Sequence, residues 1–353
     1  MAEEIARPKG PDEDAPLDDG HAARAKRRSA ARIEQLLFPI LAGVVHGLIA
    51  RGAFGHSKAQ EFLGVMTASF ILLVPLTIGM LVVVLGERRG PMNLSERLTT
   101  AVFSALLALA ACLALAWEGI ICVFLWVPLY AALAAVGALI GGAAADWHNR
   151  NERDTRMLSL VVLLPYLVAP LERRFETRDE IRVVENVIRI EASPEAIWSQ
   201  IERVPRFREE EHHFALSHVI GFPRPVEATL SHEGVCGVRH ATFEGNVLFI
   251  ETITHWEEPR KLTFGIHADA DTIPPHTLDE HVTIGGPYFD VLEGEYELEP
   301  LADGAVLLHL RSRHRVSTHF NFYATLWTDF IMSDVQSYIL EIVKRRSEAL
   351  GQR

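Results

Sequence analysis

Residues 188–198 read Ile-Arg-Ile-Glu-Ala-Ser-Pro-Glu-Ala-Ile-Trp, and they mark the start of a folded domain in the second half of the chain. Ile188 and Ile190 lie on one face of an alternating segment, which is typical of a strand that buries one side. The segment Ser193-Pro194-Glu195 then predicts a helix start, because serine caps free N–H groups, proline suits the first turn and an acid suits the positive end of the helix dipole. A strand followed directly by a helix is therefore expected here.

The residues that follow predict a run of antiparallel strands and one long closing helix. Turn signals at Gly245-Asn246 and Asp303-Gly304 separate neighbouring strands. The closing helix, about residues 320–350, carries an apolar stripe that includes Ile331 and Tyr338. The strands after the first are expected at residues 226–231, 238–243, 247–256, 261–268, 288–298 and 305–316.

The two halves of the chain differ in charge and in hydrophobicity. The 353 residues are 49% hydrophobic and carry a net charge of −12; residues 1–170 hold 15 basic and 15 acidic side chains, whereas residues 171–353 hold 19 and 31. This distribution excludes a uniform soluble globule, a disordered chain and a basic nucleic-acid-binding protein. A disulfide scaffold is excluded as well, because Cys112 and Cys122 lie in apolar runs and only Cys236 lies in the acidic half.

Four apolar runs in the first half predict a four-helix transmembrane region over residues 33–146. The first and weakest run covers residues 36–50. Residues 62–85 carry no charge and are long enough to cross a hydrocarbon core of roughly 30 Å. Residues 98–145 are too long for one helix, so we expect two spans that turn at Trp117-Glu118-Gly119.

Basic residues predict the orientation of these spans. Residues 1–32 are polar and end in a basic cluster, so they predict a disordered tail on the cytoplasmic side. Arginines also follow the second and fourth spans, which favours the cytoplasm for the ends of those two spans. With four predicted spans, the chain is expected to be a multi-pass protein of the cell (inner or plasma) membrane. Gly137 and Gly141 form a GxxxG spacing that provides a helix-packing face and is compatible with a homo-oligomer through the transmembrane helices.

Residues 147–180 form a linker whose apolar part, Leu158–Pro170, is ambiguous. Its 13 residues would cover only about 20 Å as a helix, and two prolines weaken it further. We favour an interfacial helix, which leaves the C-terminal domain in the cytoplasm. A short fifth span is the alternative, and it would place the second half of the chain outside.

The opening stretch resembles the start of the helix-grip (SRPBCC) superfamily, which includes START lipid-transfer domains, plant pathogenesis-related proteins and polyketide cyclase/dehydrase-like proteins. The resemblance covers roughly residues 183–350 and implies a START-like domain over residues 181–353: a curved antiparallel sheet wrapped around the C-terminal helix, with a mostly apolar cavity between them. The expected fold class is therefore an α-helical membrane region plus an α+β helix-grip domain. Other stretches similar to a bacterial polyketide-cyclase-like group are residues 237–240, 253–259, 274–276 and 326–329.

Alternation in the 288–298 strand selects candidate ligand-binding residues, since one face should line the cavity and the glutamate-rich face should meet water. Asp290 falls on the predicted inward face, where burial raises the pKa of a carboxyl. It would orient a ligand hydroxyl or act as an acid–base group, unless it pairs with a neighbour at the open end of the strand. Aromatic residues at such spacing are also typical of plain core. The candidate set is Tyr288, Asp290, Leu292, Tyr296, His276, Tyr323 and Trp327.

Other chemistry-bearing patterns match no known site. The series His232, Cys236, His240 is spaced by four, which on a continuous strand separates successive ligands by about 13 Å. The histidines of residues 276–281 are five apart and fit neither HExxH nor HxxEH. The sequence shows neither a nucleophile elbow nor a phosphate-binding glycine loop. We therefore expect no metal, no cofactor and no identifiable catalytic set.

Three functions fit these observations. The first is a membrane-anchored module that binds a hydrophobic ligand, a lipid or polyketide-like molecule, in an internal cavity. The second is a cyclase or dehydratase that uses the same cavity with help from Asp290 or His276. The third is a membrane-tethered interaction or regulatory protein. We favour the first, with the ligand and the lipid bilayer as partners and with no nucleic acid.

Overall fold

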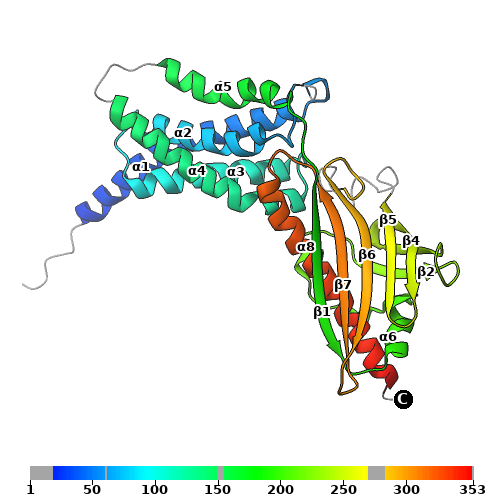
Figure 1. Ribbon diagram of the computed structural model, residues 1–353. Helices are drawn as coiled ribbons and strands as arrows, with labels where there is room; N and C mark the ends of the chain where they lie inside the picture. Colours follow the sequence, from blue (N-terminus) through cyan, green and yellow to red (C-terminus); the bar gives the residue numbers. More distant parts are fainter. Residues whose placement is uncertain (1–18, 60–61, 149–154, 269–282, 352–353) are drawn as a thin grey trace, which may run out of the picture.

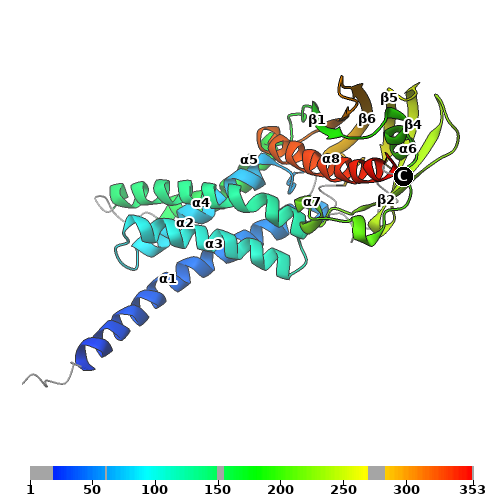
Figure 2. The ribbon, with the colours of Figure 1, turned by 90° about the horizontal axis from the view of Figure 1, so that it is seen from below.

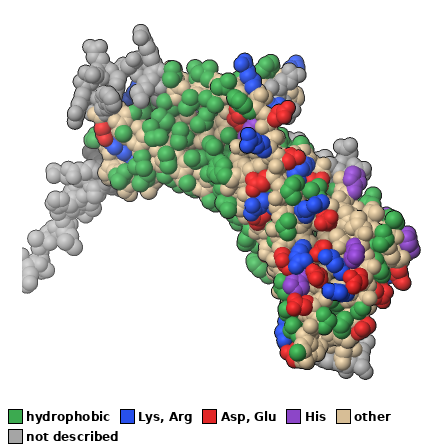
Figure 3. All heavy atoms as spheres, viewed as in Figure 1, with side chains coloured by type: hydrophobic (Ala, Val, Ile, Leu, Met, Phe, Trp, Pro, Cys, Tyr) green, Lys and Arg blue, Asp and Glu red, His purple; other side chains and the backbone are tan. Residues whose placement is uncertain are grey.

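The computed structural model describes residues 19–59, 62–148, 155–268 and 283–351, and it has two parts (Figure 1). The first part is a bundle of helices. The second is an antiparallel sheet with a long helix across one face, attached at one end of the bundle. Figure 3 shows hydrophobic side chains over most of the visible bundle surface, whereas charged side chains gather on the second part.

Four helices of the bundle are long and apolar enough to cross a membrane, as the sequence predicts. The turn predicted at residues 117–119 is confirmed, because one helix ends at Ala114 and the next begins at Ile120. The elements of the bundle are α1 (Asp19–Phe54), a short 3-10 turn η1 (Ser57–Ala59), a π-helical turn η2 (Ser69–Leu73), α2 (Val74–Glu87), α3 (Leu94–Ala114), α4 (Ile120–His148) and α5 (Thr155–Glu172).

Two helix starts differ from the prediction. Helix α1 begins at Asp19, so the disordered tail expected over residues 1–32 is wrong for residues 19–32; these residues are rich in alanine, arginine and lysine, which favour helix. The second span begins at Ser69 instead of residue 62. Residues 1–18 lie outside the described residues.

Helix α5 runs along the bundle (Figure 1). It begins close in sequence to the end of α4, and it ends where the Glu172 carboxylate accepts hydrogen bonds from the N–H groups of Ala68 and Ser69, at 2.6 and 2.7 Å. Its 18 residues correspond to about 27 Å, because the helix takes in flanking residues that hydropathy alone leaves out.

Close packing inside the bundle depends on glycine. A Cβ atom at Gly137 would overlap the carbonyl oxygen of Leu76, and one at Gly79 would overlap the carbonyl oxygen of Ala134. The backbones of α2 and α4 therefore approach each other directly. The GxxxG spacing of Gly137 and Gly141 thus serves packing within one chain.

The second part is a helix-grip fold. Its seven antiparallel strands lie in the order β1-β7-β6-β5-β4-β3-β2, and the C-terminal helix α8 (Asn321–Gly351) packs against β1 and β7 (Figures 1 and 2). The strands are β1 (Glu180–Ile190), β2 (Pro225–Leu230), β3 (Val238–Phe243), β4 (Val247–Glu257), β5 (Lys261–Ala268), β6 (Phe289–Pro300) and β7 (Val306–Val316). Between β1 and β2 lie α6 (Pro194–Ile201), η3 (Glu209–Glu211) and α7 (Leu216–Val219), and η4 (Glu244–Asn246) joins β3 to β4.

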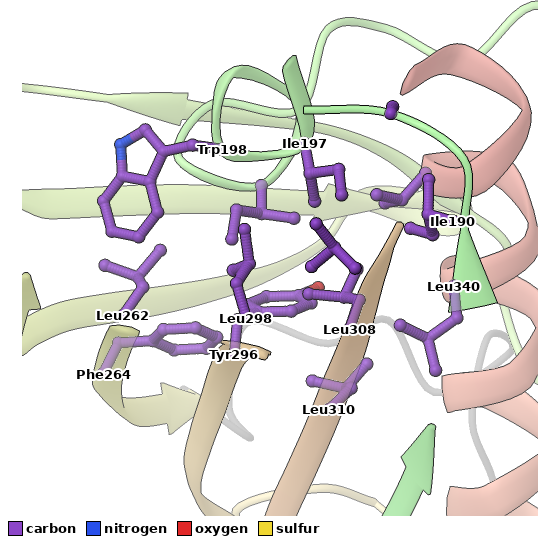
Figure 4. Close-up of a cluster of buried hydrophobic side chains, with 14 of the residues drawn as sticks. Ile190, Ile197, Trp198, Leu262, Phe264, Tyr296, Leu298, Leu308, Leu310 and Leu340 are labelled. Carbon is purple, nitrogen blue, oxygen red and sulfur yellow. The ribbon is translucent and has the colours of Figure 1, made fainter. Parts of the chain in front are cut away.

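The predicted alternation builds the core of this domain. Figure 4 shows the cluster, in which α6 and α8 contribute beside β1, β5, β6 and β7. The predicted cap is present, because the Ser193 side chain accepts a hydrogen bond from the N–H of Ala196. On the outer face Arg311 pairs with Glu295 and Glu297, at 2.9 and 2.8 Å, as expected for facing rows of opposite charge.

The two parts meet through α8 and α4. The Tyr323 hydroxyl donates to the carbonyl oxygen of Leu125. The ring of Trp327 lies 5.7 Å from that of Phe124, and the ring of Phe320 lies 5.2 Å from that of Trp126. The start of the closing helix is therefore packed on the helical bundle.

Candidate functional site

A cavity of about 250 Å³ lies between the sheet, α8 and the helical bundle. This volume is near the lower end of the roughly 300–1,000 Å³ typical of small-molecule sites. Its walls are almost entirely apolar. Three of its lining residues, Met66, Leu125 and Trp126, come from the helical bundle, and the others come from the helix-grip domain.

The sheet supplies the inner end of this cavity. Ala241 of β3 and Phe249 of β4 are buried and line it, together with Phe264 of β5 and Tyr296 of β6. Burial raises the pKa of the Tyr296 phenol to about 12, so this side chain stays neutral at physiological pH. The surface that these residues present favours an apolar occupant.

One charged pair faces this apolar space. Arg239 and Glu251 sit opposite each other on β3 and β4, and their side chains are 3% and 10% exposed. Nε of Arg239 lies 3.2 Å from Oε2 of Glu251, and the guanidinium carbon lies 4.8 Å from the centre of the Phe264 ring. Burial raises the pKa of the Glu251 carboxyl, while the nearby positive charge opposes that shift.

The polar atoms of this pair are incompletely satisfied. Within the described part of the chain, Nε and Nη1 of Arg239 and Oε2 of Glu251 make no aligned hydrogen bond. Gln336 of α8 also lines the cavity; its Nε2 donates to Val184 O and Ser312 Oγ, at 3.0 and 2.9 Å, while its Oε1 has no partner among the described residues. Buried polar groups without partners are costly, so a ligand that supplied hydrogen bonds here would be stabilised.

Four of the seven sequence-selected residues line the cavity: Tyr288, Tyr296, Tyr323 and Trp327. A fifth, His276, lies outside the described residues. The structure therefore brings together the aromatic members of the set, two from the sheet side and two from α8.

Asp290 and Leu292 do not line the cavity, which corrects the predicted inward face of β6. The pairing of β6 with β7 shifts between Val291 and Glu293, so a bulge changes which residues point inward. Before the bulge, Phe289 and Val291 line the cavity. After the bulge, Gly294 and Tyr296 line it, and both belong to the face that the sequence predicted. Asp290 is instead paired in register with Arg315; partial burial raises the pKa of its carboxyl and the Arg315 charge opposes the shift.

Arg239 and Glu251 were missed by the sequence prediction, although a signal for them exists. Glu251 lies between Phe249 and Ile253 on the apolar face of β4, and a charged residue on an otherwise apolar face is the signal. Arg239 lies likewise on the face of β3 that carries Ala241.

The described residues hold no group of three or more His, Cys, Asp or Glu side chains arranged to bind a metal ion. Cys236 is exposed. The Thr328 hydroxyl lines the cavity and lies 3.2 Å from Nε2 of the buried His314, which in turn lies 3.4 Å from Oδ1 of Asp329. The described wall thus offers mainly apolar contact, with one buried charged pair.

A second ion pair fixes the wall that carries Phe207. Arg346 of α8 binds Glu211 of η3 in a two-pronged contact, with Nε–Oε1 and Nη2–Oε2 distances of 2.7 and 2.8 Å. The same guanidinium lies over the ring of Phe207, which lines the cavity, with its carbon 4.7 Å from the ring centre. This contact ties the segment between α6 and β2 to the closing helix.

The pH dependence of stability should report this contact. Arg346 lowers the pKa of Glu211 from 4.5 to about 2, so the stabilisation is complete above about pH 4.5 and is lost as the pH falls towards 2. We expect Glu211→Gln to lower the free energy of unfolding by about 1.5–3 kcal/mol at pH 7, and the difference from the unmodified chain to shrink as the pH falls to 3. Thermal melts across this range, with the exposed Glu209→Gln as control, check it. A difference that stays constant with pH would contradict it.

Comparison with known proteins finds similarity in structure. No protein-family model matches the sequence, and no curated protein matches it. One similar solved structure is a truncated norcoclaurine synthase from Thalictrum flavum, with 11% sequence identity and a TM-score of 0.31, covering 51% of this chain and 99% of that one. Another is a START superfamily protein from Mycobacterium smegmatis, with 13% identity and a TM-score of 0.32, covering 48% of this chain and 98% of that one. A third is the Zhui aromatase/cyclase from Streptomyces sp. R1128, with 14% identity and a TM-score of 0.31, covering 49% of this chain and 99% of that one. These matches cover about half of this chain, and its own strand order and closing helix define the helix-grip fold.

Proposed function

We propose that this chain is a membrane-anchored binding protein that holds a hydrophobic ligand in the cavity between its helix-grip domain and its membrane helices. The observation that carries the proposal is the shared wall of the cavity. Leu125 and Trp126 lie on a helix that is long and apolar enough to span a membrane, and both also line the cavity. An apolar molecule in the bilayer would therefore lie close to the site.

The buried pair favours a ligand with a neutral polar group. Arg239 and Glu251 carry opposite charges, so a charged headgroup would leave a net charge in a site of low dielectric constant. A hydroxyl group both donates and accepts. It would accept from the guanidinium and donate to the carboxylate, satisfying the atoms that lack partners.

The enzyme alternative has less support from the geometry. Asp290, one of the two side chains considered for acid–base chemistry, lies on the other face of β6. The other, His276, lies outside the described residues. Binding is the function that the cavity supports best.

A plug in the cavity tests the proposal. Ala241→Trp places a large side chain where Ala241 is buried in the wall, and we expect it to weaken binding of the neutral probe 1-pyrenemethanol at least tenfold. His240→Trp is the matched control, because His240 is exposed on the opposite face of β3. Binding is measured on the full chain in detergent by energy transfer from tryptophan to pyrene. Equal binding by both variants, with unchanged melting temperatures, would contradict the proposal.

A further inference from the structure

We infer that α5 is a fifth membrane crossing, so that the helix-grip domain lies on the extracytoplasmic surface with an apolar stripe of α8 against the lipid of that leaflet. The inference concerns the side of the membrane and the surface that meets it. It goes beyond the proposed function and does not require that the cavity hold a ligand. If the cavity does, the ligand exchanges with the extracytoplasmic leaflet.

The path of α5 carries the first step. The opposite end of the bundle is marked by the ion pairs of Arg97 with Glu87 and Asp146, at 2.9 and 2.8 Å, and α4 ends beside Asp146. Helix α5 starts a few residues after α4 and ends at Glu172, which binds the start of the second span. It therefore passes from one end of the bundle to the other. The whole helix is about 27 Å long and its apolar part, Ser159–Glu172, is about 21 Å long, against a hydrocarbon core of roughly 30 Å.

The domain is attached at the end that α5 reaches. Tyr323 of α8 donates to Leu125 in the first turns of α4, and Ile121 packs with Val204 and Ala228 of the domain. Figure 1 shows the N-terminal part of α1 and the sheet at opposite ends of the bundle.

Basic residues then assign the two ends. The described segments at the end away from the domain, residues 24–32, 88–97 and 155–156, hold nine Lys and Arg in the sequence. The segments at the domain end, residues 51–58 and 173–182, hold six. An excess of basic residues marks the cytoplasmic side, and the first spans usually dominate orientation. The end away from the domain is therefore cytoplasmic.

An apolar stripe on α8 supplies the contact with lipid. Phe322, Leu326 and Phe330 follow each other at intervals of four, which places them on one face of the helix, and they are 64%, 66% and 45% exposed. The stripe continues the lipid-facing surface of α4, because Trp327 contacts both Phe330 and the half-exposed Phe124, with ring centres 6.2 and 5.7 Å apart. Continuity with a membrane helix identifies the bilayer surface as the partner of this stripe.

The native cysteines allow a direct test of the sidedness. Cys236 is exposed on the domain, whereas Cys112 and Cys122 are buried in the bundle. In cells or right-side-out vesicles that express the full chain, a membrane-impermeant maleimide should label Cys236 without permeabilisation, and Cys236→Ser should abolish the labelling. As a reference for the other side, Ser95→Cys in the Cys236→Ser background should be labelled only in inside-out vesicles. Labelling of Cys236 and of the cysteine at position 95 from the same side would overturn the fifth crossing.

A second measurement tests the lipid contact separately. A nitroxide attached at Leu326→Cys, in the Cys236→Ser background, should be relaxed by oxygen and protected from a water-soluble nickel complex in proteoliposomes. The control is Arg345→Cys, an exposed position near the other end of α8, where the nickel complex should have full access. Equal access of the nickel complex at both positions would overturn the lipid contact. Both measurements report where residues lie relative to the membrane, whereas the Ala241→Trp experiment reports ligand binding. Either result can therefore fail while the other succeeds.

Discussion

Replacing Arg239 with methionine is expected to lower the free energy of unfolding of the helix-grip domain by about 3–5 kcal/mol, because the change leaves the Glu251 carboxylate buried and unpaired. For a domain of this size the melting temperature should fall by roughly 6–20 °C. Burial already raises the pKa of Glu251, and loss of the neighbouring positive charge raises it further. The variant should therefore regain stability as the pH falls, since protonation removes the unpaired charge.

A double variant separates stability from binding. Arg239→Met with Glu251→Leu replaces the whole pair by apolar side chains of similar size, which is often neutral or stabilising. We expect a melting temperature close to that of the unmodified chain, together with 1-pyrenemethanol binding that is weaker by about fivefold to thirtyfold, as for the loss of one or two hydrogen bonds. Thermal melts and the tryptophan–pyrene titration on the same samples check both parts. Full binding by a stable double variant would show that the pair is structural only.

Gly137→Leu is expected to disrupt the membrane bundle, at a cost of about 3 kcal/mol or more. The added side chain would overlap the Leu76 carbonyl oxygen on α2. The overlap can be relieved only by separating the backbones of α2 and α4, which are packed in direct contact. The matched control is Gly52→Ala, where the nearest atom to an added Cβ is a Trp117 ring carbon at 4.0 Å. The melting temperature and the fraction of monodisperse protein in detergent should fall for the first variant only. A Gly137→Leu chain as stable as the control would contradict the packing described for α2 and α4.

Much of the helix-grip fold could be predicted from local pattern. The start of α6 was visible in Ser193-Pro194-Glu195, and strands β3 and β5 have the predicted bounds, because alternation with one buried face is a strong constraint on register. The turns at Gly245 and Gly304 adopt the positive φ angles that their residue types suggested. The resemblance of residues 188–198 to the helix-grip superfamily agreed with these local features.

The errors have definite physical origins. The bulge in β6 exchanges the two faces of the strand, so the alternation around Asp290 and Leu292 pointed to the wrong side. The extent of α5 depends on packing against Phe54 and Phe70 and on the Glu172 contacts, which involve residues about a hundred positions away in sequence. The cavity could not be predicted in full either, since part of its wall comes from the helical bundle and no local pattern specifies how two parts of a chain meet.

We propose that the shared cavity holds an apolar molecule with a neutral polar group. The most direct test is mass spectrometry of the small molecules extracted from the purified full chain, beside its Ala241→Trp and His240→Trp variants. We expect a near-stoichiometric apolar species that carries a hydroxyl group, present in the unmodified chain and in His240→Trp and depleted in Ala241→Trp. The same lipids in all three samples, in proportion to the detergent extract, would contradict the claim.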